Sequence, residues 1–149
     1  MTQYKAADLS DPAYFHSQGN AWADDKTATP AAALATTDTI DLMRVARGVR
    51  LQELFKTNGD FDTGATLAYN LGYRKVNTDG MLADNASYFA AAATDMQAVV
   101  TGAAPTRYAF APITFSEDVF ITLTPTTGAA GVSGTPSIVL YARGAIPGK

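Results

Sequence analysis

The sequence predicts a mainly β protein whose strands form two layers packed face to face. Between residues 64 and 73 the large apolar residues fall on every second position: Leu67, Tyr69, Leu71 and Tyr73. Successive side chains of a strand point to opposite faces, so this segment has one apolar face that a second layer must cover. The same period of two recurs in residues 118–124 and 137–143. A length of 149 residues suits one domain with a sizeable core.

The first part of the chain, residues 1–36, differs from the rest. Turn-forming pairs interrupt it at short intervals, so no strand or helix period is sustained. It nevertheless contains Tyr14, Phe15 and the sole tryptophan, Trp22, whereas disordered tails are usually poor in aromatic residues. We interpret this part as an extended N-terminal arm that docks either on its own domain or on a neighbouring subunit. Residues 37–149 then form the β-sandwich domain.

Two strands are expected next, at residues 39–45 and 49–56. The apolar residues of this region also fit helical spacing, and Asp38 fits the N-cap of such a helix. We favour strands because Gly48 interrupts any long helix and residues 57–60, Thr-Asn-Gly-Asp, form a strong turn signal.

One short helix is predicted at about residues 85–101. Small and apolar residues recur there at spacings of three and four: Ala86, Phe89, Ala90, Ala93, Met96 and Val100. Gly102 suits the left-handed residue that ends a helix. Extended structure is expected again at residues 107–115, where Pro112 indicates an edge or a bulge. The glycine-rich residues 125–136 predict an exposed loop.

Composition excludes several classes of function. A formal net charge of −3 argues against a nucleic-acid partner, which requires a basic stripe. No apolar run approaches the ~18 residues of a membrane span. With no cysteine and one histidine, His16, the chain offers no thiolate site and little basis for a zinc site. The N-terminus lacks the pattern of a secretion signal, so we expect assembly in the cytoplasm.

Carboxylates are the remaining enzymatic possibility. Asp60 and Asp62 flank Phe61, and Glu117 precedes Asp118, and a hydrolase needs two such groups facing one cleft. Both pairs fall at turns or strand starts, where acidic residues commonly bond to the local backbone. We therefore predict no catalytic residue, no cofactor and no metal ligand, and no enzymatic activity. A weak surface cation site at the acidic turn 58–62 stays open.

Three arginines, Arg44, Arg47 and Arg50, form the densest basic group, although Asp41 and Glu53 interleave with them. This mixture indicates a solvated or interface face. Aromatic residues supply much of the energy at interfaces, which adds the arm to the candidates. The predicted interface residues are Tyr4, Tyr14, Phe15, Trp22, Arg44, Arg47 and Arg50.

Two runs of the chain resemble capsid decoration (cement) proteins, the small head structural proteins of tailed bacteriophages. They are Asp38-Thr-Ile-Asp-Leu-Met-Arg-Val-Ala-Arg-Gly-Val-Arg-Leu-Gln-Glu-Leu and Thr66-Leu-Ala-Tyr-Asn-Leu-Gly-Tyr73. Three later segments, residues 87–94, 117–123 and 137–141, also resemble these proteins. The chain departs from the family at Ala46, where a proline often stands. The resemblance covers roughly residues 36–143 and leaves the arm unmatched.

The resemblance implies a jelly-roll-like antiparallel β-sandwich on the exterior of an icosahedral capsid. Its implied partners are the major capsid protein and copies of itself, as a dimer or trimer, and its implied location is the virion after assembly in the host cytoplasm. Such a protein stabilises the assembled shell by binding it, and it needs contact surface but no catalytic group.

A second hypothesis stays open at this point. A carbohydrate-binding β-sandwich module, for instance on a phage head fibre, would stack exposed aromatic rings on sugars. Trp22, Tyr69 and Tyr73 are the candidate residues for that role.

Overall fold

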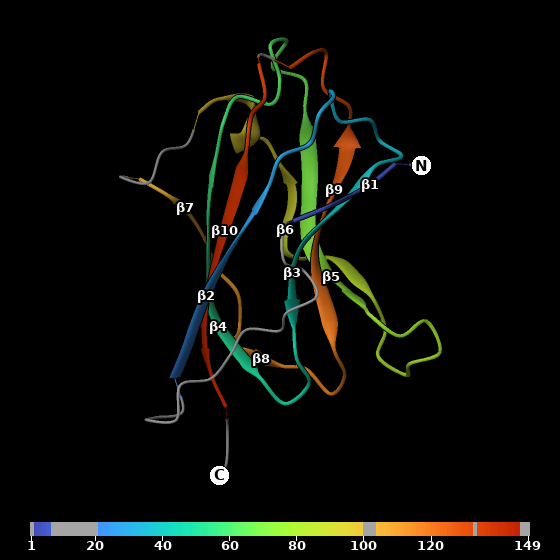
Figure 1. Cartoon of the computed structure of the whole chain (residues 1–149), viewed down its shortest axis with the longest axis vertical. Helices are drawn as coiled ribbons and strands as arrows, with labels where there is room; N and C mark the ends of the chain where they lie inside the picture. The colour runs from blue at the N-terminus through green and yellow to red at the C-terminus, as the bar shows by residue number, and fades with distance from the viewer. Residues whose placement is uncertain (1, 7–20, 100–103, 133, 147–149) are drawn as a thin grey trace.

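The computed structural model describes residues 2–6, 21–99, 104–132 and 134–146, and it shows two β-sheets packed face to face (Figure 1). Within these ranges no helix is long and apolar enough to cross a membrane. The elements are β1 (Gln3–Lys5), β2 (Ala21–Ala28), β3 (Thr39–Val45), β4 (Arg50–Asn58), β5 (Ala68–Lys75), β6 (Asn85–Ala93), a 3-10 turn η1 (Asp95–Gln97), β7 (Thr106–Tyr108), β8 (Ile113–Thr114), β9 (Val119–Thr127) and β10 (Ile138–Ala145).

The strand order is that of a jelly roll. One sheet runs β2-β10-β4-β7, with β8 also paired to β4, and the other runs β1-β3-β9-β5-β6. Lettering β2 to β7 as B to G, and β9 and β10 as H and I, turns these orders into BIDG and CHEF, the two sheets of an eight-stranded jelly roll. We call them the BIDG sheet and the CHEF sheet. The predicted class, a mainly β, jelly-roll-like sandwich, is confirmed.

The core lies between the two sheets, and the alternating strands supply it as predicted. On β5, Tyr69, Leu71 and Tyr73 are buried. The inward residues of β9 and β10 are also buried: Val119, Ile121, Leu123, Ile138, Leu140 and Ala142. This confirms that a period of two identified the apolar face of these strands.

The choice of strands over helix for residues 39–56 is also confirmed. The region forms β3 and β4, joined by a turn in which Gly48 has φ of 81°. Glycine adopts this left-handed conformation without the steric penalty of a side chain. The turn predicted at residues 57–60 is wrong in its position, because Thr57 and Asn58 still belong to β4 and the turn follows at residues 63–65.

The predicted helix at residues 85–101 is wrong. Residues 85–93 form the edge strand β6, and only the short turn η1 at Asp95–Gln97 is helical within the described residues. Ala92 has φ of 49°, and the pairing of β6 with β5 shifts register twice. Alanine favours a helix by less than 1 kcal/mol per residue, roughly, so pairing with β5 and burial of Phe89 override that preference.

Two described segments of the predicted arm are strands of the sandwich. β1 lies parallel to β3 at the edge of the CHEF sheet, and β2 lies antiparallel to β10 at the edge of the BIDG sheet. These segments dock on their own chain, one of the two possibilities considered for the arm. The division at residue 36 stays a prediction, because residues 7–20 lie outside the described residues.

Candidate functional site

The three predicted arginines lie at one end of the sandwich, around the β3–β4 turn at the lower end of the view in Figure 1. Arg44 pairs with Asp118 through an Nη2–Oδ2 distance of 2.6 Å, and the backbone N–H of Arg47 donates to the same carboxylate at 2.9 Å. Burial opposes ionisation of Asp118, but these donors hold its pKa below the usual range. Arg44 therefore anchors this end, whereas Arg47 and Arg50 are exposed.

The aromatic candidates are separated by the fold. Trp22 is buried, and its indole occupies the space beside Gly144, where an added Cβ would lie 2.5 Å from the indole nitrogen. Tyr4 is half-buried on β1, and Tyr14 and Phe15 lie outside the described residues. The assignment of all these residues to an interface stays a prediction, although Trp22 cannot reach a partner without rearrangement.

The aromatic residues proposed for sugar binding are not exposed. Trp22, Tyr69 and Tyr73 have exposed fractions of 5%, 0% and 8%, so they present no ring face to a ligand. The hypothesis of a carbohydrate site built on these three residues is wrong. Alternation correctly placed the two tyrosines on one face of β5, but that face is the core.

The acidic residues considered for catalysis serve local structure. Asp62 is buried and accepts hydrogen bonds from four backbone N–H groups, and Asp60 accepts one from the N–H of Asp62 at 3.0 Å. Glu117 accepts a hydrogen bond from the backbone N–H of Met81 at 2.7 Å. Asp118 binds Arg44 and the backbone of Arg47 at the end of the sandwich that carries the three arginines, which we call the arginine end. Asp60 and Asp62 thus bond to the nearby backbone as turn chemistry predicts, whereas Glu117 and Asp118 bind donors that are distant in the sequence.

A buried polar network lies between the sheets near η1. The Lys56 ammonium, whose side chain is fully buried, is 3.0 Å from Asp95, which also accepts from the hydroxyls of Tyr69 and Thr106. The hydroxyl of Tyr69 is 2.7 Å from that of Tyr108. Burial lowers the pKa of Lys56 and raises the pKa of both tyrosines, whereas the pKa of Asp95 is lowered because Lys56 and the hydroxyls outweigh burial.

This network ties η1 to β4, β5 and β7, and it supplies no site open to a substrate. Its polar groups satisfy one another, as buried polar groups must. Among the residues that the structure describes, no three acidic or histidine side chains gather closely enough to hold a metal ion.

The outer face of the CHEF sheet carries a polar cluster formed by Asp41, Arg74 and Gln3. Asp41 is fully buried and accepts from Arg74 at 3.0 and 2.6 Å and from Gln3 at 2.7 Å. The guanidinium of Arg74 also lies 4.8 Å from the centre of the Phe120 ring. The charges of Asp41 and Arg74 on this face are therefore neutralised within the chain.

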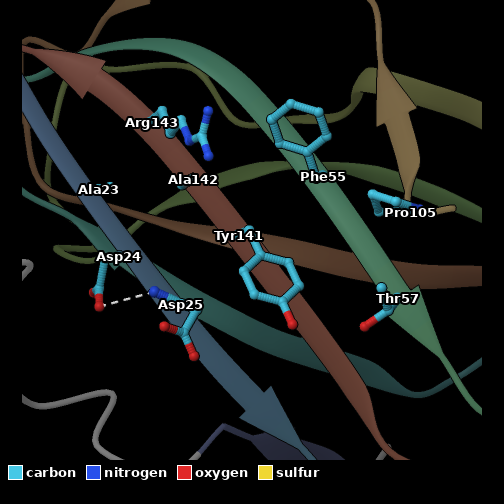
Figure 2. Close-up of a pocket in the computed structure, with 9 residues that line it drawn as sticks. All are labelled: Ala23, Asp24, Asp25, Phe55, Thr57, Pro105, Tyr141, Ala142 and Arg143. Carbon is cyan, nitrogen blue, oxygen red and sulfur yellow. Dashed lines mark hydrogen bonds between the residues drawn. The ribbon is translucent and has the colours of Figure 1, made fainter. Parts of the chain in front are cut away.

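The outer face of the BIDG sheet is different. A shallow groove of about 450 Å³ crosses it, lined by residues of β2, β10 and β4 and by Pro105 (Figure 2). Tyr141, 38% exposed, pairs across the sheet with Phe55, and the side chains of both line the groove. The guanidinium groups of Arg107 and Arg143 lie 5.7 and 5.8 Å from the centre of the Phe55 ring. Exposed aromatic rings with arginine are typical of protein interfaces.

These groove residues were missing from the predicted interface. The alternation of residues 137–143 had placed Tyr141 and Arg143 on the face opposite the apolar residues, which was the available signal. Their approach to Phe55 and Arg107 depends on pairing between strands that are far apart in sequence, and no local pattern shows it.

No protein-family model matches the chain, and no curated protein matches its sequence. Two solved structures are similar over nearly the whole length. A chain in the capsid of Ralstonia phage GP4 is 18% identical with a TM-score of 0.72, covering 99% of this chain and 100% of that one. A chain in the capsid asymmetric unit of cyanophage Pam1 is 17% identical with a TM-score of 0.67, covering 95% and 96%. At 17–18% identity, this similarity shows that the chain shares the fold of these two chains.

Proposed function

We propose that the protein is a virion structural protein that binds the outer surface of an icosahedral phage capsid and stabilises it by bridging major capsid protein subunits. The observation that supports this most strongly is the match, over 95% or more of each chain, to chains from two phage capsid structures. A likeness confined to a common sandwich core would leave the edge strands and long connections unmatched. Here the match includes them.

The distribution of polar groups supports adhesion over catalysis. The described carboxylates at turns bond to the backbone, and the buried lysine network closes on itself, so these groups hold the fold. The exposed groups are instead spread over broad surfaces: the arginine end with Arg47 and Arg50, and the outer face of the BIDG sheet. A non-enzymatic contact protein needs such surfaces.

The mechanism is binding linkage. A protein that binds the assembled shell but not its separated subunits stabilises the shell by mass action, and bridging neighbouring subunits adds avidity. We further propose that copies of the chain associate with one another, and that the exposed arginine end faces the capsid.

The test uses shells of the phage that encodes the chain, prepared from particles in which its gene is deleted. The purified full chain is added to expanded shells and to unexpanded ones, and co-sedimentation and the melting temperature of the shells are measured. We expect saturable binding to expanded shells, in copies comparable to the number of capsid subunits, with a higher melting temperature. Absence of binding, together with absence of the chain from purified virions by mass spectrometry, would overturn the proposal.

A variant separates capsid binding in general from the role of the arginine end. Arg47→Glu/Arg50→Glu reverses two exposed charges, and we expect weaker binding that varies with salt while the isolated protein melts unchanged. As a control, Asp79→Arg changes an exposed charge on the β5–β6 connection. Unchanged binding by the double variant would show that another surface meets the shell.

A further inference from the structure

The outer face of the BIDG sheet carries a row of side chains that is complementary to itself. The registers of β2, β10, β4 and β7 place Asp25, Tyr141, Phe55 and Arg107 side by side across the four strands. An acid stands at one end of the row, a base at the other, and two aromatic rings between them. Figure 2 shows the first three on one face of the sheet, bordering the groove.

The part of the face around Glu53 on β4, between Arg107 on β7 and Arg143 on β10, has an excess of positive charge. Glu53 accepts from Arg107 at 3.0 Å and lies 3.8 Å from Arg143, so one carboxylate is shared by two guanidinium groups. Both arginine side chains are 67% exposed. One positive charge of this group is therefore left over for a partner.

The β2 end of the face has an excess of negative charge. Lys26 lies 3.6 Å from Asp24 and offsets its charge. Asp25 is exposed on the outer face, and within the described part of the chain its carboxylate has no cationic partner. Asp25 thus carries an unneutralised negative charge. Arg107, which stands about three strand spacings, or ~14 Å, away, belongs to the Arg107–Glu53–Arg143 group, which has an excess of one positive charge.

We propose that two copies of the chain associate through this face, about a two-fold axis that lies in the interface, parallel to the strands, between β10 and β4. Such an axis sets β2 against β7 of the partner and β10 against β4 of the partner. Asp25 then meets the partner's Arg107, and Tyr141 meets the partner's Phe55. An isologous interface of this kind requires a self-complementary patch.

The neighbouring rows agree with the same axis. Arg143 is paired with Glu53 across the sheet, so it meets the partner's Glu53, and Val139 meets the partner's Thr57. An in-plane axis perpendicular to the strands would instead set Asp25 against the partner's Asp25. Like charges would then face each other, which disfavours that arrangement.

The size of the face indicates a weak dimer. β2, β10 and β4 have eight or nine residues and are at least about 26 Å long, whereas β7 has only three, so the flat area of the four strands is on the order of 400 Å² per copy. This lies at the low end for specific interfaces. The inference rests on the self-association in the proposed function and on no property of the capsid, and association should be sought at micromolar concentration.

The test is sedimentation equilibrium of the full chain over the micromolar range. We expect the wild type to dimerise, and Asp25→Arg and Arg107→Asp each to raise the dissociation constant on the order of tenfold or more, because each puts like charges in contact twice. An equimolar mixture of the two variants should regain the dimer, because in the heterodimer both contacts again join opposite charges. Asp79→Arg, with the same charge change as Asp25→Arg on an exposed loop, should behave as wild type.

The outcomes separate the alternatives. A wild type that stays monomeric throughout, or single variants that still dimerise, would overturn this interface; in the second case self-association through another surface would stand. Loss of the dimer in both variants without recovery in the mixture would refute the row-against-row arrangement. Urea unfolding of each variant verifies that it is folded. Shell binding is measured separately, so a failure here leaves the proposed capsid role untouched.

Discussion

Asp62→Ala should be among the most damaging changes to a single polar side chain in this protein. The carboxylate is 2% exposed and accepts from the backbone N–H groups of Gly64 and Ala130, at 3.0 and 2.9 Å, and from those of Thr66 and Leu67. The Thr66 hydroxyl adds a further bond at 3.1 Å. One side chain thus ties the turn before β5 to the loop after β9.

The magnitude follows from the donors that lose their acceptor. A hydrogen bond to a charged group contributes about 1.5–3 kcal/mol, and a buried donor left unpaired costs a similar amount. The four bonds lie within one pair of loops that can relax toward water, so they do not add. We expect the free energy of unfolding to fall by about 3–4 kcal/mol, which corresponds to a melting temperature lower by about 10 °C.

The effect should depend on pH with a definite sign. Burial opposes ionisation of Asp62, but the N–H donors of Leu67, Gly64, Ala130 and Thr66 outweigh it and hold the pKa well below its ordinary value of 3.8. Because the folded-state pKa is below the unfolded one, the stabilisation is fully present above about pH 5 and is lost as the pH falls below 4. The difference between wild type and Asp62→Asn should therefore shrink in acid.

The assay is urea unfolding of wild type, Asp62→Ala, Asp62→Asn and a matched control, measured between neutral pH and pH 3. The control is Asp60→Ala, two residues away, which removes a single hydrogen bond and should cost about 1 kcal/mol. If Asp62→Ala is as stable as this control, the carboxylate does not hold the loops. A difference that persists unchanged at pH 3 would refute the electrostatic explanation.

Two further predictions concern close packing and the buried ion pair. Gly72→Ala should lower the free energy of unfolding in urea by more than about 3 kcal/mol, because the new Cβ would lie 2.0 Å from the backbone oxygen of Asn85. The control Gly134→Ala has open space around it and should lose only about 1 kcal/mol through its positive φ. Equal losses in the two variants would contradict the packing argument. Asp95→Asn should cost about 3–5 kcal/mol by leaving Lys56 buried without its partner, and combining it with Lys56→Met should cost less than the sum of the single changes. Additivity within about 0.5 kcal/mol would show that the pair is not coupled.

The strands could be predicted where the local pattern is itself the cause of the structure. In β5, apolar side chains at every second position can be buried together only in an extended chain, as Tyr69, Leu71 and Tyr73 are. The β3–β4 turn could be predicted for a similar reason, because the positive φ of Gly48 is a local property.

The failure at residues 85–101 has an equally specific cause. A run of alanines has no strong preference for either face of a strand, so its spacing fits a helix as well as anything else. What decides the conformation is β5, about 20 residues earlier in the chain, which pairs with β6 and buries Phe89. That contact is non-local and leaves no mark within the segment.

The outer face of the BIDG sheet could likewise be predicted only in part from the sequence. The sequence alone determined that this is a mainly β sandwich, that the pairs Asp60/Asp62 and Glu117/Asp118 stand at turns or strand starts, and that Tyr141 and Arg143 share a face. Only the tertiary structure decided that β2 joins β10 and that Asp25, Tyr141, Phe55 and Arg107 form one row. The physical reason is that side-chain alternation is set within a strand, whereas the register between strands is set by the packing of the whole sandwich.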